Sequence, residues 1–320
     1  MTKRAAMRQA TPDDLPTLRT LARAALVHDP DAPAIVDLLW NAAADGCRIV
    51  AEDSGGEPTA QSARTTLGFA LGSVRPARDG QPATGHVDLL VVAADHRGRG
   101  IGRALLAEVE RRLIAAGATR LRIRGNPPTH AWPGVDIRYT PALCLAESAG
   151  YERLLDGTNM LVDLAAATED GLLATDADER RLAALGVEIR RGEPKDEEPL
   201  REWVEGEFGG SWAAECAMAL RNEPPTLHLA VRDGAFLGFA AHSAQRIPVF
   251  GPMGTDEAAR GLGIGAVLLR RCLADQRDAG VAVAEIGWVG PVRFYSRAVG
   301  ARLGRVFWTY EKAVHDKTVP

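Results

Sequence analysis

The sequence lacks most of the features that mark metalloproteins, membrane proteins and nucleic-acid-binding proteins. Its four cysteines show no paired metal spacing, and Cys144 and Cys272 lie in apolar stretches that are typical of buried thiols. No apolar run reaches membrane-spanning length, and the first residues lack a secretory core. The net charge of -4 argues against a general nucleic-acid footprint, although a local basic patch stays open. We therefore expect a cytoplasmic protein with no metal, no membrane and no nucleic acid.

What the chain does have is the size and composition of a two-domain globular protein. Hydrophobic residues make up 46% and charged residues 25% of its 320 positions. This length suits two domains of about 150 residues, each of which can bury its own core.

A glycine-rich motif occurs twice. Residues 97–102 and 260–265 both read Arg-x-x-Gly-x-Gly, and each follows a strand-like stretch and precedes an apolar helical run. A strand, a glycine-rich turn and a helix N-terminus together form an anion cradle, because the turn exposes N–H groups and the helix dipole adds positive charge. Both motifs therefore predict a bound pyrophosphate.

The repeat extends beyond the motif. An offset of 163 residues relates the two motifs and also relates Gly117 to Gly280, whereas Gly150 and Gly300 are 150 residues apart. The first copy thus holds 13 more residues after its long helix, in a stretch that includes 126–134. Loops tolerate such insertions, so we interpret the chain as a duplicated domain. The predicted boundaries are a first domain 1–165, a helical connector 166–186 and a second domain 187–320.

Each half has the predicted element order β-α-α-β-β-β-α-β-α-β. In the first half the strands are expected at 6–10, 47–51, 65–74, 86–92, 120–124 and 160–164, and the helices at 11–27, 32–44, 102–116 and 141–148. In the second half the strands are expected at 187–190, 227–231, 236–241, 247–255, 281–288 and 306–310, and the helices at 193–205, 212–220, 265–279 and 292–299.

This order, with the motif between the fourth strand and the third helix, resembles the GNAT superfamily of Gcn5-related N-acetyltransferases. The run 90–98 is similar to the family's strand-to-loop run, and the second copy keeps the same spacing to its motif. The resemblance covers nearly the whole chain, twice. It implies an α/β (α+β) fold with two tandem GNAT domains, each a mixed, mostly antiparallel sheet flanked by helices.

The resemblance also implies acetyl-CoA as the co-substrate. In GNATs the strand before the motif splays from its neighbour at a bulge and pairs with the pantetheine arm, and the glycine turn holds the pyrophosphate. The implied cofactor residues in the first half are Leu90, Val91, Val92, Arg97, Gly98, Arg99, Gly100, Ile101, Gly102 and Arg103. Those in the second half are Met253, Gly254, Thr255, Arg260, Gly261, Leu262, Gly263, Ile264, Gly265 and Ala266.

The departing thiolate needs a proton, which a neutral tyrosine can donate near pH 7. GNATs often place such a tyrosine on the fourth helix, five residues before a glycine, and Tyr295 matches this position. Packing against the sheet is the alternative role for Tyr295. The equivalent residue before Gly150 is Leu145, which cannot donate a proton. We therefore predict that Tyr295 is catalytic and that catalysis resides in the second half.

The base that deprotonates the acceptor is less defined. His86, Asp88 and Leu90 alternate along one strand and would share a face, so His86 and Asp88 are a candidate pair, with a solvated strand end as the alternative. In the second half the candidates are Glu285 and His242, or a water chain to a backbone carbonyl.

The sequence thus predicts an acetyl-CoA-dependent N-acetyltransferase that acts on a primary amine of an unidentified small-molecule or peptide acceptor. The first half is expected to bind CoA without necessarily transferring acetyl. A non-catalytic CoA-binding or sensing protein is the alternative. A dinucleotide-binding oxidoreductase is disfavoured, because residues 98–102 lack the Gly-x-Gly-x-x-Gly spacing.

Overall fold

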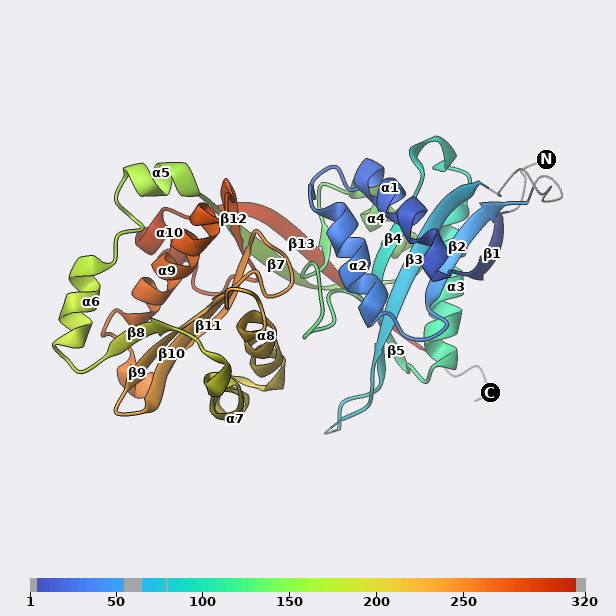
Figure 1. The fold of residues 1–320 in the computed structure, drawn as a ribbon. Helices are drawn as coiled ribbons and strands as arrows, with labels where there is room; N and C mark the ends of the chain where they lie inside the picture. Colours follow the sequence, from blue (N-terminus) through green and yellow to red (C-terminus); the bar gives the residue numbers. More distant parts are fainter. Residues whose placement is uncertain (1–4, 55–64, 79, 315–320) are drawn as a thin grey trace. The chain divides into compact units, whose positions relative to one another are not determined.

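The chain forms two compact units in a computed structural model that describes residues 5–54, 65–78 and 80–314 (Figure 1). The first unit takes the chain up to Asp156 and again from Phe307 onward, and the second unit takes Gly157–Val306. None of the described helices is long and apolar enough to cross a membrane.

The first unit is a mixed sheet with helices on both faces. Its strands are β1 (Ala5–Gln9), β2 (Arg48–Asp53), β3 (Thr66–Arg75), β4 (Thr84–Val92), β5 (Arg120–Ile123), the short β6 (Val135–Asp136) and the end of β13 (Arg302–Ala313). Neighbours are antiparallel from β1 to β4, β4 and β5 are parallel, and β13 pairs antiparallel with β5 and β6. Its helices are η1 (Pro12–Asp14), α1 (Leu15–Ala25), α2 (Ala32–Ala42), η2 (Ala94–His96), α3 (Ile101–Ala115) and α4 (Thr140–Ser148).

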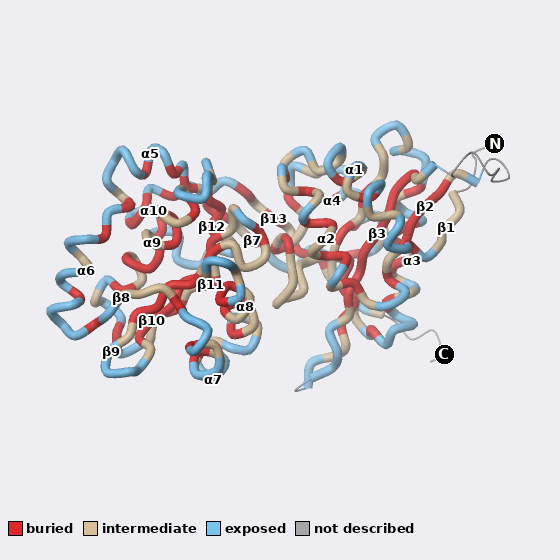
Figure 2. The backbone as a smooth tube through the Cα atoms, in the orientation of Figure 1, coloured by how far each residue is buried: buried red, intermediate tan, exposed pale blue. Residues whose placement is uncertain are grey.

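Two hydrophobic clusters hold these layers together. Helix α3 buries Leu105, Val109 and Leu113 on one face of the sheet, at the three-to-four-residue spacing of an amphipathic helix. Helices α1 and α2 bury Leu18 and Ile35 on the opposite face (Figure 1). Figure 2 shows that the strands between these helices are the most buried part of the unit.

The second unit repeats this design. Its strands are β8 (Glu188–Arg191), β9 (Leu227–Arg232), β10 (Ala235–His242), β11 (Val249–Thr255), β12 (Val283–Ile286) and the second part of β7 (Glu152–Asp163). Pairs β8–β9, β9–β10 and β10–β11 are antiparallel, β11–β12 is parallel, and β12–β7 is antiparallel. Its helices are α5 (Leu164–Glu169), α6 (Asp176–Ala183), η3 (Pro194–Asp196), α7 (Glu197–Phe208), α8 (Gly210–Leu220), η4 (Glu257–Ala259), α9 (Ile264–Asp278) and α10 (Val292–Val299). Each unit therefore has the predicted mixed, mostly antiparallel sheet flanked by helices.

The last strand of each sheet comes from the other half of the chain. Residues 310–313 of β13 pair with β5 in the first unit, and residues 160–163 of β7 pair with β12 in the second. The compact units therefore differ from the predicted boundaries at 165 and 187. The limits 1–165 and 187–320 therefore remain a prediction about where the repeated sequence begins and ends. The sequence of a strand does not indicate which sheet it joins, so the exchange of last strands could not be included in that prediction.

The segment between the two halves belongs to the second unit. Its helices α5 and α6 bury Leu164, Ala167 and Leu182 in the same cluster as α9. Ion pairs from α9 add to this packing, because Arg271 and Arg270 bind Glu179 and Asp178 on α6. The expected connector is therefore helical, but it is also part of a hydrophobic core.

Candidate active site

Both glycine motifs form a turn that leads directly into a helix. Gly100 and Gly263 are the N-cap residues of α3 and α9, with φ of +82° and +85°. Gly98 and Gly261 also have left-handed φ angles, of +72° and +84°. Among the described residues no side chain caps the N-terminus of either helix. The first-turn N–H groups are therefore left for an external anion, which fits a diphosphate.

The glycines are required by backbone conformation rather than by internal packing. A Cβ added at Gly98, Gly100 or Gly261 would meet no described atom within 4 Å, whereas a positive φ disfavours any side chain. The second turn differs in one respect. A Cβ added at Gly263 would lie 2.8 Å from Nη2 of Arg181, which comes from α6. The positively charged Arg181 guanidinium group therefore lies beside the second turn.

The strand before each motif has a bulge. In the first unit Leu71 pairs with Leu89 but Gly72 pairs with Val87, so Asp88 is the extra residue on β4. In the second unit the register changes between Met253 and Phe250, where Gly251 has a φ of +132°. An offset of 163 relates Asp88 to Gly251. The two bulges therefore coincide, but only the first carries a carboxylate, because the second consists of Gly251 and Pro252.

The parallel neighbour of each bulged strand separates from it. The pairing of β4 with β5 extends to His86 and Arg122, and the pairing of β11 with β12 extends to Phe250 and Ile286. Both pairings thus end just before the residues that the resemblance assigns to the pantetheine arm. This geometry leaves backbone groups of β4 and β11 free of a strand partner on that side.

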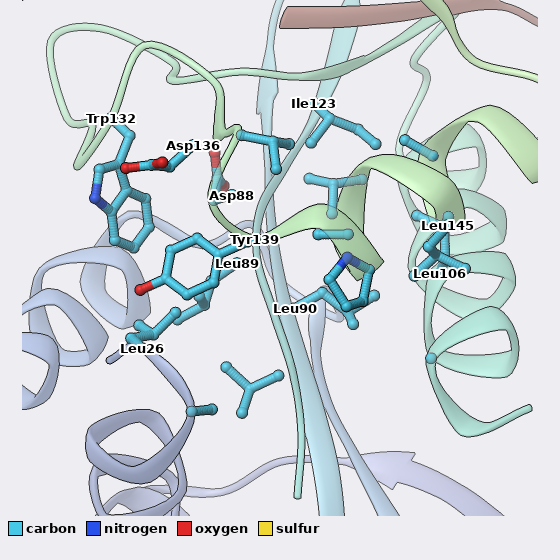
Figure 3. Close-up of a pocket in the computed structure, with 18 of the residues that line it drawn as sticks. Leu26, Asp88, Leu89, Leu90, Leu106, Ile123, Trp132, Asp136, Tyr139 and Leu145 are labelled. Atoms are coloured by element: carbon cyan, nitrogen blue, oxygen red, sulfur yellow. The ribbon is translucent and has the colours of Figure 1, made fainter. Parts of the chain in front are cut away.

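A cavity of about 340 Å³ lies beside this opening in the first unit. Figure 3 shows Asp88 on its wall, with Trp132 and Tyr139 on one side and Leu106 and Leu145 on the other. Six of the predicted cofactor residues line the cavity, namely Leu90, Val91, Val92, Arg97, Gly98 and Gly102. Arg99, Gly100, Ile101 and Arg103 belong to the same turn and helix but are not part of the cavity wall.

Asp88 is the titratable group best placed for chemistry in this cavity. Its Oδ2 is buried and has no hydrogen-bond partner among the described residues. Burial raises the pKa of Asp88 from 3.8 to about 7, against a lowering by the hydrogen bond from Ser73. A carboxyl group with a pKa near the working pH is suited to accept and release a proton.

The expected pair of His86 and Asp88 does not form. The His86 ring lies with Nδ1 3.1 Å from the Arg124 carbonyl oxygen and does not line the cavity. Burial lowers the pKa of His86 to about 4, so the ring is neutral at pH 7. The bulge at Asp88 explains the error, because an extra residue breaks the two-residue alternation on which the prediction rests.

The opposite wall of the cavity is built by the segment that the first copy has in excess. Trp132 Nε1 donates to Asp29 Oδ1 at 2.8 Å, and the Tyr139 hydroxyl donates to Asp29 Oδ2 at 3.0 Å. The same hydroxyl accepts from the His28 backbone N–H at 3.0 Å. These bonds fix the wall to the loop between α1 and α2. The 13-residue length difference was the only sequence signal for this wall.

In the second unit Tyr295 is 7% exposed and packs against Phe250 and Phe294. Burial raises the pKa of Tyr295 to about 12, so the phenol stays protonated at pH 7. None of the hydrogen bonds described for residues 5–314 uses its hydroxyl. Tyr295 thus retains a proton that it could donate.

Contacts with the helix of the glycine motif relate Tyr295 to Ala146, the neighbour of Leu145. A Cβ added at Gly102 would meet Leu145 at 3.4 Å, and one added at the matching Gly265 would meet Phe294 at 3.6 Å. Leu145 therefore corresponds to Phe294, and the next residue on each helix is buried. The spacing to the following glycine relates Tyr295 to Leu145 instead. The two helices end differently, because the Gly150 N–H bonds to the carbonyl of Glu147, three residues before it, whereas the Gly300 N–H bonds to that of Ser296, four residues before it. Alanine, like leucine, has no proton to give.

The two candidate bases of the second unit are engaged by internal partners. Glu285 is buried with Arg305, whose Nη1 lies 3.2 Å from Oε2, and it accepts a bond from Asn159. His242 Nδ1 lies 3.0 Å from Ser243 Oγ, and His242 Nε2 lies 3.4 Å from Asp275 Oδ2. No group of three or more His, Cys, Asp or Glu is placed to hold a metal within the described residues.

The comparisons with known proteins agree with this geometry. A family model described as "Acetyltransferase (GNAT) family" matches residues 15–132. Mycothiol acetyltransferase of Thermomonospora curvata is 31% identical over 273 residues, which cover 82% of this chain and 80% of that protein. The chain belongs to the GNAT acetyltransferases. It is an N-acetyltransferase of a family that takes its acetyl group from acetyl-CoA.

Solved GNAT structures share the complete fold. A tandem GNAT protein from the clavulanic acid biosynthesis pathway matches with a TM-score of 0.66 at 18% identity, over 98% of this chain and 99% of that one. A GCN5-related glucosamine N-acetyltransferase region of a fungal beta-N-acetylglucosaminidase matches with a TM-score of 0.75 at 18% identity. The match covers 96% of this chain but only 38% of the fungal protein, which has several domains. The predicted tandem GNAT fold is therefore confirmed.

Proposed function

We propose that this GNAT enzyme acetylates a primary amine of a small molecule that binds in the cavity of the first unit. The observation that carries the proposal is the Asp88 carboxyl group, which lies on the cavity wall with a pKa near 7. The volume of about 340 Å³ is within the range of small-molecule sites. The 31% identical relative is itself named for the small molecule mycothiol, which supports this acceptor class.

The residues of the first unit have distinct roles in this proposal. The turn at Gly98 and Gly100 and the N-terminus of α3 hold the diphosphate of the co-substrate, and the free edge of β4 at residues 90–92 orients its pantetheine arm. Acetyl-CoA supplies the activated acetyl group. Asp88 accepts the ammonium proton of the amine, directly or through one water, before the neutral nitrogen attacks the acetyl carbon, and the second N–H proton leaves to solvent as the C–N bond is completed. Solvent supplies the proton for the departing thiolate, because Ala146 and Leu145 have none.

A second candidate site is the corresponding region of the second unit. Its support is Tyr295, which is protonated at neutral pH and has the position of a GNAT acid. The turn at Gly261 and Gly263, with Arg181 beside it, suits a second CoA molecule. In this case the first unit binds CoA without catalysis, as the sequence predicts.

Two single variants decide between the units. A panel of small primary amines is screened with acetyl-CoA by thiol release, and the best acceptor is then used with Asp88→Asn, Tyr295→Phe and the exposed-site control Asp170→Asn. General base catalysis is typically worth about 10²- to 10⁴-fold, so we expect Asp88→Asn to lower kcat/KM by that range. Tyr295→Phe and Asp170→Asn should retain activity within about threefold of wild type. Loss of activity in Tyr295→Phe with full activity in Asp88→Asn would move the site to the second unit.

A further inference from the structure

We infer that the acceptor of the first unit is a primary amine with an uncharged, apolar body, which lies against a wall formed by Leu26, Trp132 and Tyr139. The inference rests on the proposed function, because it describes the acceptor of that same site. Figure 3 shows these three side chains on one side of the cavity, and Leu106 and Leu145 on the other.

The two sides of the cavity come from different parts of the chain. Leu90, Val92 and Gly98 line it from the strand and turn that hold the co-substrate in the proposed function. The other side is lined from α1, from α2 and from the inserted segment, residues 126–139. A pantetheine arm on the first side leaves the second side to the body of the acceptor, with the amine directed toward Asp88.

The polar atoms of the aromatic wall are already used inside the protein. Asp29 is 2% exposed, and its Oδ1 accepts from Trp132 Nε1 at 2.8 Å while its Oδ2 accepts from the Tyr139 hydroxyl at 3.0 Å. The indole N–H has a single proton to donate, and the phenol also accepts from the His28 N–H. The ring carbons are therefore the atoms that remain for the acceptor. A hydroxyl group placed against them would lose its bonds to water without replacement.

The charges on this side fit an amine that carries no second ionic group. Asp136 lines the cavity, but Arg138 binds both of its oxygens, with Nε 2.9 Å from Oδ1 and Nη2 2.6 Å from Oδ2. The buried Asp88 Oδ2 has no hydrogen-bond partner among the described residues, so an ammonium group is drawn to Asp88 rather than to Asp136. Arg124 and His130 also line the cavity and could bind an acid, so an acidic amine is one arm of the test.

Three amines with chains of similar length test the acceptor class, namely hexylamine, diglycolamine and ε-aminocaproate. Diglycolamine replaces one methylene and the terminal methyl group of hexylamine by an ether oxygen and a hydroxyl, and ε-aminocaproate replaces the methyl group by a carboxylate. A buried polar group without a partner is costly, so we expect kcat/KM for hexylamine to exceed that for either of the others by about tenfold to a hundredfold. A preference for diglycolamine or ε-aminocaproate would overturn the inference.

Leu26 offers a matched pair of variants. Leu26→Met keeps the wall apolar, whereas Leu26→Asn has a similar size and adds an amide. The ratio of kcat/KM for hexylamine to that for diglycolamine should fall by about fivefold to tenfold in Leu26→Asn and stay within about twofold in Leu26→Met. The exposed Leu185 of the second unit supplies the control Leu185→Asn. Because a ratio cancels any loss of folded enzyme, an unchanged ratio in Leu26→Asn would contradict the inference. If Leu26→Asn does not fold, the wild-type selectivity still decides.

A binding measurement does not depend on turnover. Intermolecular NOEs are recorded by NMR between hexylamine, at its KM, and the full chain with labelled leucine methyl groups in the presence of CoA. We expect NOEs to the Leu26 methyl groups, which are assigned by their absence in Leu26→Asn, and the lack of such NOEs in wild type would count against the inference. Full activity in Asp88→Asn would refute the proposed function itself. Loss of activity in Asp88→Asn, together with a preference for diglycolamine, would overturn the acceptor class alone.

Discussion

A carboxylate that is held in a cavity for catalysis should weaken the fold that holds it. Burial raises the pKa of Asp88 from 3.8 to about 7, so the native protein binds the Asp88 proton more tightly than the unfolded chain does. Stability from this group is complete below pH 3.8 and declines as the pH rises toward 7. We therefore predict that Asp88→Asn, which removes the charge, stabilises the protein at pH 8 while it reduces activity.

The size of this effect follows from the pKa. One pH unit corresponds to about 1.4 kcal/mol, so ionisation of Asp88 costs the native state about 4 kcal/mol at pH 8 and about 1.5 kcal/mol at pH 5. An asparagine at this site has a buried amide of its own, whose unpaired N–H costs about 1–3 kcal/mol. That cost is the same at both pH values. The variant should therefore gain about 2–3 kcal/mol relative to wild type between pH 5 and pH 8.

Urea denaturation of wild type and Asp88→Asn at both pH values measures this double difference, with Asp170→Asn as the control. Asp170 is exposed, so its replacement should leave the difference near zero. A loss of stability in Asp88→Asn that is equal at pH 5 and pH 8 would refute the reasoning, because it would mean that burial does not penalise the Asp88 carboxylate.

Two further predictions concern the two glycine-rich turns and the buried Glu285–Arg305 ion pair of the second unit. Calorimetry should detect two CoA sites per chain. Gly100→Val and Gly263→Val should each remove one of these sites, because valine disfavours a φ above +80°. If wild type has a single site and that site survives Gly100→Val, the first unit does not bind CoA. Glu285→Ala should destabilise the protein by about 3–5 kcal/mol in urea, because it leaves the buried Arg305 guanidinium without its carboxylate. A loss of kcat in Glu285→Ala without loss of stability would instead support Glu285 as a base.

The helices and strands that could be predicted well are those whose own residues carry a recognisable pattern. The long helices α3 and α9 follow from apolar spacing and a glycine turn, and both begin within one residue of the predicted position. The alternation of strands and helices then identified the tandem fold. The exchange of last strands was not predictable in the same way. Residues 310–313 and 160–163 have ordinary strand sequences, and their partners are chosen by the edges that β5 and β12 leave open.

In the candidate site, too, the features with a local sequence signal could be predicted, and those that depend on strand pairing or tertiary contacts could not. The glycines of both turns could be located from their spacing, because a left-handed backbone requires that residue type. The isolation of His86 from Asp88 could not be predicted, since the bulge that separates them is a property of strand pairing. The hydrogen bonds that join Arg75 to Asn126 and Asn126 to Ser73 could not be predicted either. These residues lie on β3 and in the inserted segment, and no spacing in the sequence brings them together.

The two units differ in which proposed catalytic side chain they carry. At the bulge the first unit has Asp88 and the second has Gly251, and on the last helix the first has Ala146 and the second has Tyr295. In our proposal each unit therefore has one of the two groups, a base or an acid, that acetyl transfer to an amine uses. Which unit transfers acetyl depends on which missing group is harder to replace.

The pKa values of the reactants support our proposal that the first unit is the catalytic one. A thiol has a pKa near 8.5, so a thiolate can leave at pH 7 and take its proton from water, which makes a missing acid tolerable. An alkyl amine has a pKa near 10.4, so fewer than about one molecule in a thousand is neutral at pH 7. An amine that enters an apolar cavity as a cation must lose its proton there before it can attack the acetyl group. The unit that retains the carboxylate thus retains the group that solvent replaces least well.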